Sequence, residues 1–144
     1  MKVAEALEGH CLCGAVTVRV PEGAGWVGAC HCRMCQRWSG GLFLCFPADG
    51  VTVEGQVTRH ASSSFAERAF CPVCGSHLWM RDASHPEGHY ELMPGLFDEA
   101  RDWPLRSEVY ADCAMASVRL SGDHRRATRA AYELKNPHVE GDAR

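Results

Sequence analysis

The sequence of 144 residues lacks the features that mark membrane proteins and nucleic-acid-binding proteins. No stretch approaches the roughly 18 consecutive apolar residues of a membrane-spanning helix, and residues 1–8 contain no apolar run of a secretory signal. The 15 basic and 18 acidic residues are scattered, without the block of like charge that forms a nucleic-acid-binding arm. We therefore expect a cytoplasmic protein that binds neither a membrane nor nucleic acid.

The sequence shows no internal repeat or low-complexity segment. It also shows no linker, because the glycines and prolines are spread along the chain as turn signals. The length fits one domain, and 46% hydrophobic residues are enough to form a core. The sequence therefore predicts a single domain over residues 1–144.

Short apolar segments broken by turns predict a mainly β fold. Residues 15–20 alternate apolar and polar side chains and then reach the turn Pro21-Glu22-Gly23, as a half-buried strand does. Further strands are predicted over residues 26–30, 42–46, 51–53, 57–60, 64–70, 77–80, 89–93 and 106–111. Short helices are predicted over residues 33–38, 98–103 and 123–134, the last from its alanine and arginine content.

Cysteine is the residue that the chain has in excess. Nine cysteines are far above ordinary usage, and disulfides seldom explain such a number in a reducing cytosol. An odd number also argues against a complete set of disulfides. Metal binding is the better explanation.

Two spaced pairs, Cys11-x-Cys13 and Cys71-x-x-Cys74, predict one closed zinc site with four thiolates. Side chains at positions i and i+2 of a strand share a face, so both thiols of the first pair can reach one ion. Gly14 and Gly75 follow the two pairs, and a glycine at positive φ lets backbone amides point toward the sulfurs. The alternative is that one or both pairs are reduced core cysteines or a local redox dithiol.

The middle group, Cys30-x-Cys32-x-x-Cys35, offers three thiols at a predicted junction between a strand and a helix. A zinc ion with three protein ligands keeps its fourth position for water or substrate, as in catalytic sites. Its charge can hold a bound thiol as the thiolate at neutral pH. The alternative is a second structural site that His31 or another side chain closes.

The last two cysteines, Cys45 and Cys113, have no spaced partner. Each is expected to be a small buried apolar residue.

Four segments in this order, GHCLCGAVTV, ACHCRMCQRWSGG, RAFCPVCGSHLW and MPGLFDEA, resemble the glutathione-dependent formaldehyde-activating enzyme family, which includes centromere protein V. They cover about residues 9 to 112. The resemblance implies a coiled, mainly antiparallel β fold with two zinc ions per chain. It implies Cys11, Cys13, Cys71 and Cys74 as the ligands of a structural zinc and Cys30, Cys32 and Cys35 as the ligands of a catalytic zinc, in agreement with the spacing.

The resemblance also implies a reaction, the condensation of glutathione with formaldehyde, which is classed as that of a carbon-sulfur lyase in the reverse sense. Zinc would bind the sulfur of a small thiol, which would attack the aldehyde carbon. His31 and His77 are candidate proton donors, although either could be a packed or surface histidine. Arg33 and Arg37 could bind the carboxylates of glutathione or simply lie on an exposed helix face.

A second hypothesis is a zinc-stabilised binding module without catalysis, as the centromeric relative suggests. A fourth protein ligand at the middle group would favour this module, and an accessible fourth position would favour the enzyme.

Overall fold

The computed structural model describes residues 5–83 and 89–139, and the chain divides into two compact units. The first unit comprises Met1–Trp26 and Cys45–Pro104, and the second comprises Val27–Leu44 and Leu105–Arg144. Within the described ranges, we find no helix with the length and apolar character needed to cross a membrane. The expectation that the whole chain forms one domain stays a prediction.

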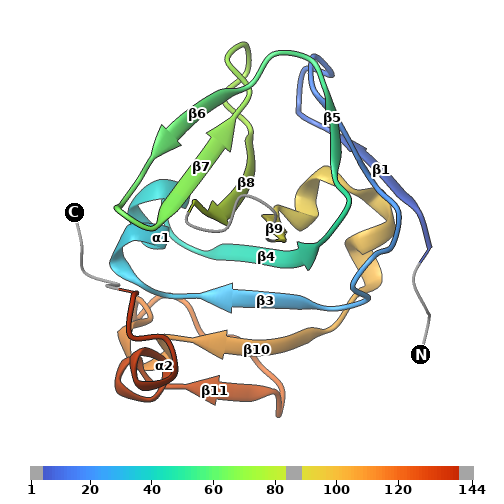
Figure 1. Ribbon diagram of the computed structural model, residues 1–144. Coiled ribbons are helices and arrows are strands. Elements are labelled where there is room, and N and C mark those ends of the chain that lie inside the picture. The colour runs from blue at the N-terminus through green and yellow to red at the C-terminus, as the bar shows by residue number, and fades with distance from the viewer. Residues whose placement is uncertain (1–4, 84–88, 140–144) are drawn as a thin grey trace. The chain divides into compact units, whose positions relative to one another are not determined.

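The first unit is built from antiparallel strands (Figure 1). One sheet has the order β1-β2-β5, with bounds β1 (Leu7–His10), β2 (Thr17–Val20) and β5 (Thr52–Glu54). A second run has the order β4-β9-β8-β7-β6, with bounds β4 (Phe43–Ala48), β9 (Tyr90–Leu92), β8 (His77–Asp82), β7 (Ala66–Phe70) and β6 (Thr58–Ala61). Of β4, the residues from Cys45 onward belong to this unit. Two 3-10 helices, η1 (Pro94–Leu96) and η2 (Asp98–Asp102), follow β9.

Alternation of apolar and polar residues gives β2 one buried and one exposed face. Val18 and Val20 are buried, whereas Arg19 between them is exposed. The Arg19 guanidinium forms ion pairs with Glu8 on β1, at 2.7 Å, and with Glu54 on β5. One face of β2 thus packs into the core, and the other face links β1, β2 and β5 through ion pairs.

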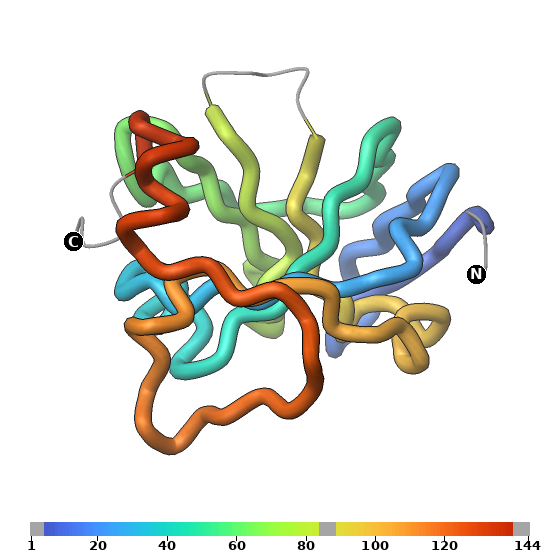
Figure 2. Tube along the Cα trace, turned by 90° about the horizontal axis from the view of Figure 1, so that it is seen from below, coloured from blue at the N-terminus to red at the C-terminus, as the bar shows by residue number. Residues whose placement is uncertain are grey.

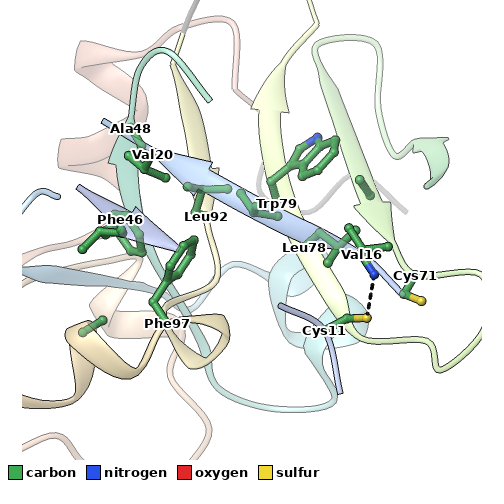
Figure 3. Packing of buried hydrophobic residues seen from close by; sticks show 14 residues of the cluster. Cys11, Val16, Val20, Phe46, Ala48, Cys71, Leu78, Trp79, Leu92 and Phe97 are labelled. Carbon is green, nitrogen blue, oxygen red and sulfur yellow. Dashed lines mark hydrogen bonds between the residues drawn. The ribbon is translucent and has the colours of Figure 1, made fainter. Parts of the chain in front are cut away.

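Aromatic side chains fill the core of the first unit. The Phe46 ring meets the rings of Phe97 and Trp103 edge to face, with centroid distances of 5.5 and 5.0 Å. Figure 3 shows Phe46 and Phe97 at one end of this core and Cys11 and Cys71 at the other. The two cysteines are fully buried, so the turns that carry them are anchored in the core.

The second unit is built around three parallel strands in the order β11-β10-β3. Its elements are β3 (Val27–Cys30), α1 (Arg33–Ser39), β10 (Leu105–Val109), η3 (Ala111–Cys113), β11 (Arg125–Ala127) and α2 (Arg129–Lys135). Figure 2 shows the chain between η3 and β11 as one long loop. Because β3 and β10 are parallel, the segments that follow Cys30 and Val109 leave the sheet at the same edge.

The mainly β prediction is confirmed, as are short helices at residues 33–39 and near the C-terminal end. The expected helix over residues 123–134 is wrong at its start, because residues 125–127 pair with β10 as a strand. Strand β1 was not predicted from the sequence. The antiparallel pairing implied by the family resemblance holds in the first unit, whereas the pairs in the second unit are parallel.

Two leucines provide a matched test of the core. Leu92 on β9 is fully buried, whereas Leu134 on α2 is 83% exposed. We expect Leu92→Ala to lower the free energy of unfolding by about 2 to 5 kcal/mol, since it removes buried methyl groups and leaves a cavity. Leu134→Ala should change it by less than about 0.5 kcal/mol. Urea unfolding followed by circular dichroism measures both, and equal losses would contradict the assigned core.

Candidate metal centres

Two turns of the first unit bring four cysteines together. Cys11 and Cys13 lie in the turn between β1 and β2, and Cys71 and Cys74 lie in the turn between β7 and β8. All four sulfur atoms lie within 4.8 Å of one another. The sulfur of Cys13 is 3.6 Å from that of Cys11 and 3.8 Å from that of Cys71.

These distances fit a tetrahedral metal site. Four sulfurs at about 2.3 Å from one zinc ion would be about 3.8 Å apart, whereas a disulfide would bring two of them to about 2.0 Å. All four cysteines are free. This group could therefore hold a metal ion, and no disulfide joins its four cysteines.

Both turns use the same backbone device. The Cys11 amide donates to the Val16 carbonyl at 3.1 Å, and the Cys71 amide donates to the Ser76 carbonyl at 2.9 Å. Gly14 and Gly75 have φ angles of 81° and 77°, as expected from the sequence. The turn also places an amide against a sulfur, because the Val16 N–H points at the Cys11 sulfur at 3.3 Å (Figure 3).

Ser76 links the two turns, a role that the sequence did not indicate. Its hydroxyl accepts a hydrogen bond from the Leu12 amide at 3.0 Å and lies 3.1 Å from the Cys74 sulfur. The Ser76 hydroxyl and amide together lower the pKa of Cys74 to about 5. The hydrogen bond from the Ala15 amide lowers the pKa of Cys13. Burial and the neighbouring thiols outweigh this effect and raise the pKa of Cys13 to about 11. Without a cation, therefore, the four sulfurs cannot all ionise near neutral pH.

The second unit holds the three-cysteine group. Cys30 ends β3, Cys32 caps the start of α1, and Cys35 lies in the first turn of that helix. Their three sulfurs lie within 4.8 Å of one another. The Cys35 amide donates to the Cys32 sulfur at 3.3 Å, as a helix N-cap acceptor requires. This group could hold a second metal ion.

Throughout residues 5–83 and 89–139, no fourth histidine, cysteine, aspartate or glutamate joins this group. His31 stands between two of the cysteines, but its Nε2 lies 2.7 Å from the Glu108 carboxylate. The structure thus does not show His31 closing the site. Crowding by Cys32 and Cys35, together with burial, raises the pKa of Cys30 well above its usual range, so the group needs a cation to ionise fully.

Gln36 and Tyr110 frame this group and were also not predicted. The Gln36 amide donates to the carbonyls of His31, at 2.7 Å, and Cys113, at 2.9 Å. Tyr110 is buried and has a φ of 55°, a left-handed conformation that costs a non-glycine residue about 1 kcal/mol or more. Burial and the hydrogen bond from its hydroxyl to Glu133, at 2.8 Å, raise the pKa of Tyr110.

The remaining predicted residues lie outside both groups. His77 is half-buried on β8 in the first unit, where burial and the charge of Arg68 lower its pKa. Arg33 and Arg37 are exposed on α1. The burial expected for the two single cysteines is wrong, because Cys45 and Cys113 are only half-buried.

The Cys45 thiol donates to the Glu91 carboxylate at 3.3 Å, so this residue makes a polar contact.

A family model for the glutathione-dependent formaldehyde-activating enzyme matches residues 6–113, which include all seven clustered cysteines. The chain belongs to this family. This membership confirms the resemblance seen in the sequence.

Two proteins similar to this chain carry the names of a lyase and of a glutathione-dependent formaldehyde-activating enzyme. An uncharacterized lyase of Schizosaccharomyces pombe is 37% identical over 75 residues, 50% of this chain and 55% of the relative. A Halomonas elongata protein, provisionally named as a glutathione-dependent formaldehyde-activating enzyme, is 36% identical over 93 residues, 56% of this chain and 59% of the relative. The chain thus spans little more than half the length of these relatives.

A crystal structure of a Rhodobacter sphaeroides protein has a similar fold, with a TM-score of 0.53 and 23% identity. The match covers 69% of this chain and 99% of that one. At this identity the match supports the fold alone.

Replacing Cys74 by serine tests the four-cysteine group. We expect loss of one bound metal ion per chain and an unfolding temperature lower by at least about 10 °C, because a metal that binds only the folded chain stabilises it. Elemental analysis and differential scanning calorimetry measure the two effects. Cys45→Ser is the matched control from the same unit and should alter neither. Unchanged metal content in Cys74→Ser would contradict the assignment.

Proposed function

We propose that the protein is a zinc-dependent carbon-sulfur lyase that forms or cleaves adducts between a small thiol, glutathione or a similar one, and an aldehyde such as formaldehyde. Family membership and the names of the relatives support this class of activity. Cys30, Cys32 and Cys35 would hold the catalytic zinc. Cys11, Cys13, Cys71 and Cys74 would hold a second, structural zinc.

The observation that carries this proposal is the three-cysteine group at the end of β3. Three sulfurs lie within 4.8 Å of one another, and no fourth such side chain from the described ranges completes the set. Three protein ligands are typical of catalytic zinc sites, whereas structural sites have four. The non-catalytic binding module would need a fourth protein ligand here, so the geometry favours the enzyme.

The donor sets suit zinc in both groups. Cysteine sulfur is a soft ligand that selects zinc over magnesium or calcium, and seven sulfurs without an oxygen ligand form the two groups. When bound, zinc supplies a positive charge that keeps a substrate thiol in its thiolate form at neutral pH. Nine cysteines without a disulfide are consistent with a reducing compartment, and we propose the cytoplasm.

The reaction conserves atoms and electrons without a further reactant. The thiolate sulfur attacks the carbon of formaldehyde, a carbon-sulfur bond forms, and the carbonyl π bond breaks. The thiol loses one proton and the carbonyl oxygen gains one, so that the product is an S-hydroxymethyl adduct. The reverse reaction cleaves the same bond. The three cysteines would hold the zinc ion, and α1 stabilises the charge on the Cys32 sulfur through the hydrogen bond from the Cys35 amide.

Two arginines of α1 are proposed to bind the carboxylates of glutathione. Arg33 and Arg37 are one helical turn apart and exposed, in the helix that carries Cys35. No ion pair within the described ranges occupies either guanidinium. Both are therefore available to an anionic ligand, for which arginine offers a pair of parallel hydrogen bonds.

Replacing Cys32 by serine separates catalysis from folding. We expect loss of one zinc ion and a fall of about 100-fold or more in adduct formation, because the ligand set is broken, while the circular dichroism spectrum is retained. Exchange NMR of glutathione with formaldehyde measures the rate, and elemental analysis measures the zinc.

Cys113→Ser, from the same unit, is the control and should keep both. If the wild-type protein does not accelerate adduct formation with any thiol of a panel, the lyase proposal fails and the binding module replaces it. Unfolding of Cys32→Ser would show that both sites are structural.

Charge reversal at the helix tests the choice of thiol. We expect Arg33→Glu combined with Arg37→Glu to raise the KM for glutathione by about tenfold, because two carboxylate contacts are lost. The kcat, and the KM for an uncharged thiol such as 2-mercaptoethanol, should stay unchanged. Steady-state kinetics with both thiols measure this, and a parallel change for the two would exclude recognition of glutathione by these arginines.

A further inference from the structure

A buried carboxylate stands behind the three-cysteine group. Glu108 on β10 is 5% exposed, and both of its oxygens have partners. Oε1 lies 2.7 Å from the Nε2 of His31, and Oε2 lies 2.5 Å from the Nε2 of His124. Arg126 adds its Nε at 3.2 Å from Oε2. Three partners that engage both oxygens leave the carboxylate no freedom to rotate.

The loop before β11, together with β11 itself, secures this carboxylate. The guanidinium of Arg126 also donates to the carbonyls of Leu120 and Gly122, at 2.9 and 3.0 Å. The His124 side chain is only 4% exposed. The loop thus supplies His124 to Glu108, and Arg126 of β11 both pairs with Glu108 and holds the loop in its path.

Burial of a charged pair is weak support for stability, because desolvation offsets most of the attraction. Three polar partners around one buried carboxylate, directly beside a metal-binding segment, therefore suggest a role besides folding. His31 is the residue through which this role would act, since it stands between Cys30 and Cys32.

Every polar group of His31 for which the structure gives a hydrogen bond is bonded to a residue other than the three cysteines. Its amide donates to the Val109 carbonyl at 3.0 Å, and its carbonyl accepts from Gln36 at 2.7 Å. Its Nε2 is engaged by Glu108. With a 2% exposed fraction, the ring is packed in this position.

Histidine nitrogen is a common fourth ligand in sites with three cysteines. His31 is adjacent in sequence to two of the cysteines, yet it is not part of their group. We propose that Glu108, itself held by His124, is a positioning residue that keeps the His31 imidazole turned toward β10 and so leaves the fourth position of the three-cysteine site to the substrate thiol. This inference rests on the proposed function.

Replacing Glu108 by alanine is the test. The His31 ring then loses its partner, and binding to the metal offers the buried nitrogen a new one. With Co2+ in place of zinc, we expect the visible spectrum of the three-cysteine site to change to that of a site with an added nitrogen ligand. We also expect kcat/KM for adduct formation to fall about tenfold or more, while two metal ions per chain are retained.

Three further variants make the result specific. Glu108→Gln keeps an oxygen that can accept from His31 and should retain the wild-type spectrum. His31→Phe introduced into Glu108→Ala removes the competing nitrogen and should restore the wild-type spectrum and part of the activity. Glu91→Ala is the matched control, because Glu91 also pairs with a histidine, His89, at 2.7 Å, but lies in the first unit. It should change neither the spectrum nor the rate.

The outcomes separate this inference from the proposed function. An unchanged cobalt spectrum in Glu108→Ala overturns the positioning role, even if the wild-type protein is an active lyase. Loss of the metal from Glu108→Ala, with no rescue by His31→Phe, also overturns it and assigns Glu108 a purely structural role. A wild-type protein without lyase activity contradicts the proposed function, whereas the spectra of the variants still decide the position of His31.

Discussion

Repulsion between crowded thiolates is the constraint on which the rest of this structure depends. Seven sulfurs stand in two groups, and within each group every sulfur lies within 4.8 Å of the others. Such sulfurs cannot all be charged in the absence of a cation, and the raised pKa values of Cys13 and Cys30 show the cost. Both groups could therefore hold a cation, and each unit places its group where the strands end.

The two units surround their cysteine groups in different ways. In the first, Cys11 and Cys71 are fully buried at one end of an aromatic core, and two turns linked by Ser76 close the group from both sides. In the second, all three sulfurs come from one short segment, so one side of the group is left to other partners. A closed group fits a structural role, and an open one fits catalysis.

The polar contacts of His31 support the proposal that the three-cysteine group stays open. His31 is adjacent to two of the three cysteines, but its amide, carbonyl and ring are all engaged elsewhere. The contacts come from β10 and α1, which are distant in sequence and meet because β3 and β10 are parallel. The number of side chains that can reach this group is thus set by the second unit as a whole, and not by the three cysteines alone.

Local sequence patterns account for most of what could be predicted about this structure. The spacing of the cysteines predicted both groups, and glycine after each pair predicted turns that only a positive φ can close. Apolar alternation located most strands. It missed β1, where Gly9 interrupts the pattern. The alanine and arginine content predicted a helix over residues 125–127, where pairing with β10 outweighs the local propensity.

What the sequence determined by itself is which cysteines can form the two groups, because a sulfur pair one or two residues apart is a local feature that survives any arrangement of the rest of the chain. Only the tertiary structure decided the contacts of Ser76, Gln36 and Glu108, since each joins segments far apart in sequence. A single serine, glutamine or glutamate carries no local pattern. Its role arises when folding removes water and leaves its hydrogen bonds to be made by distant residues.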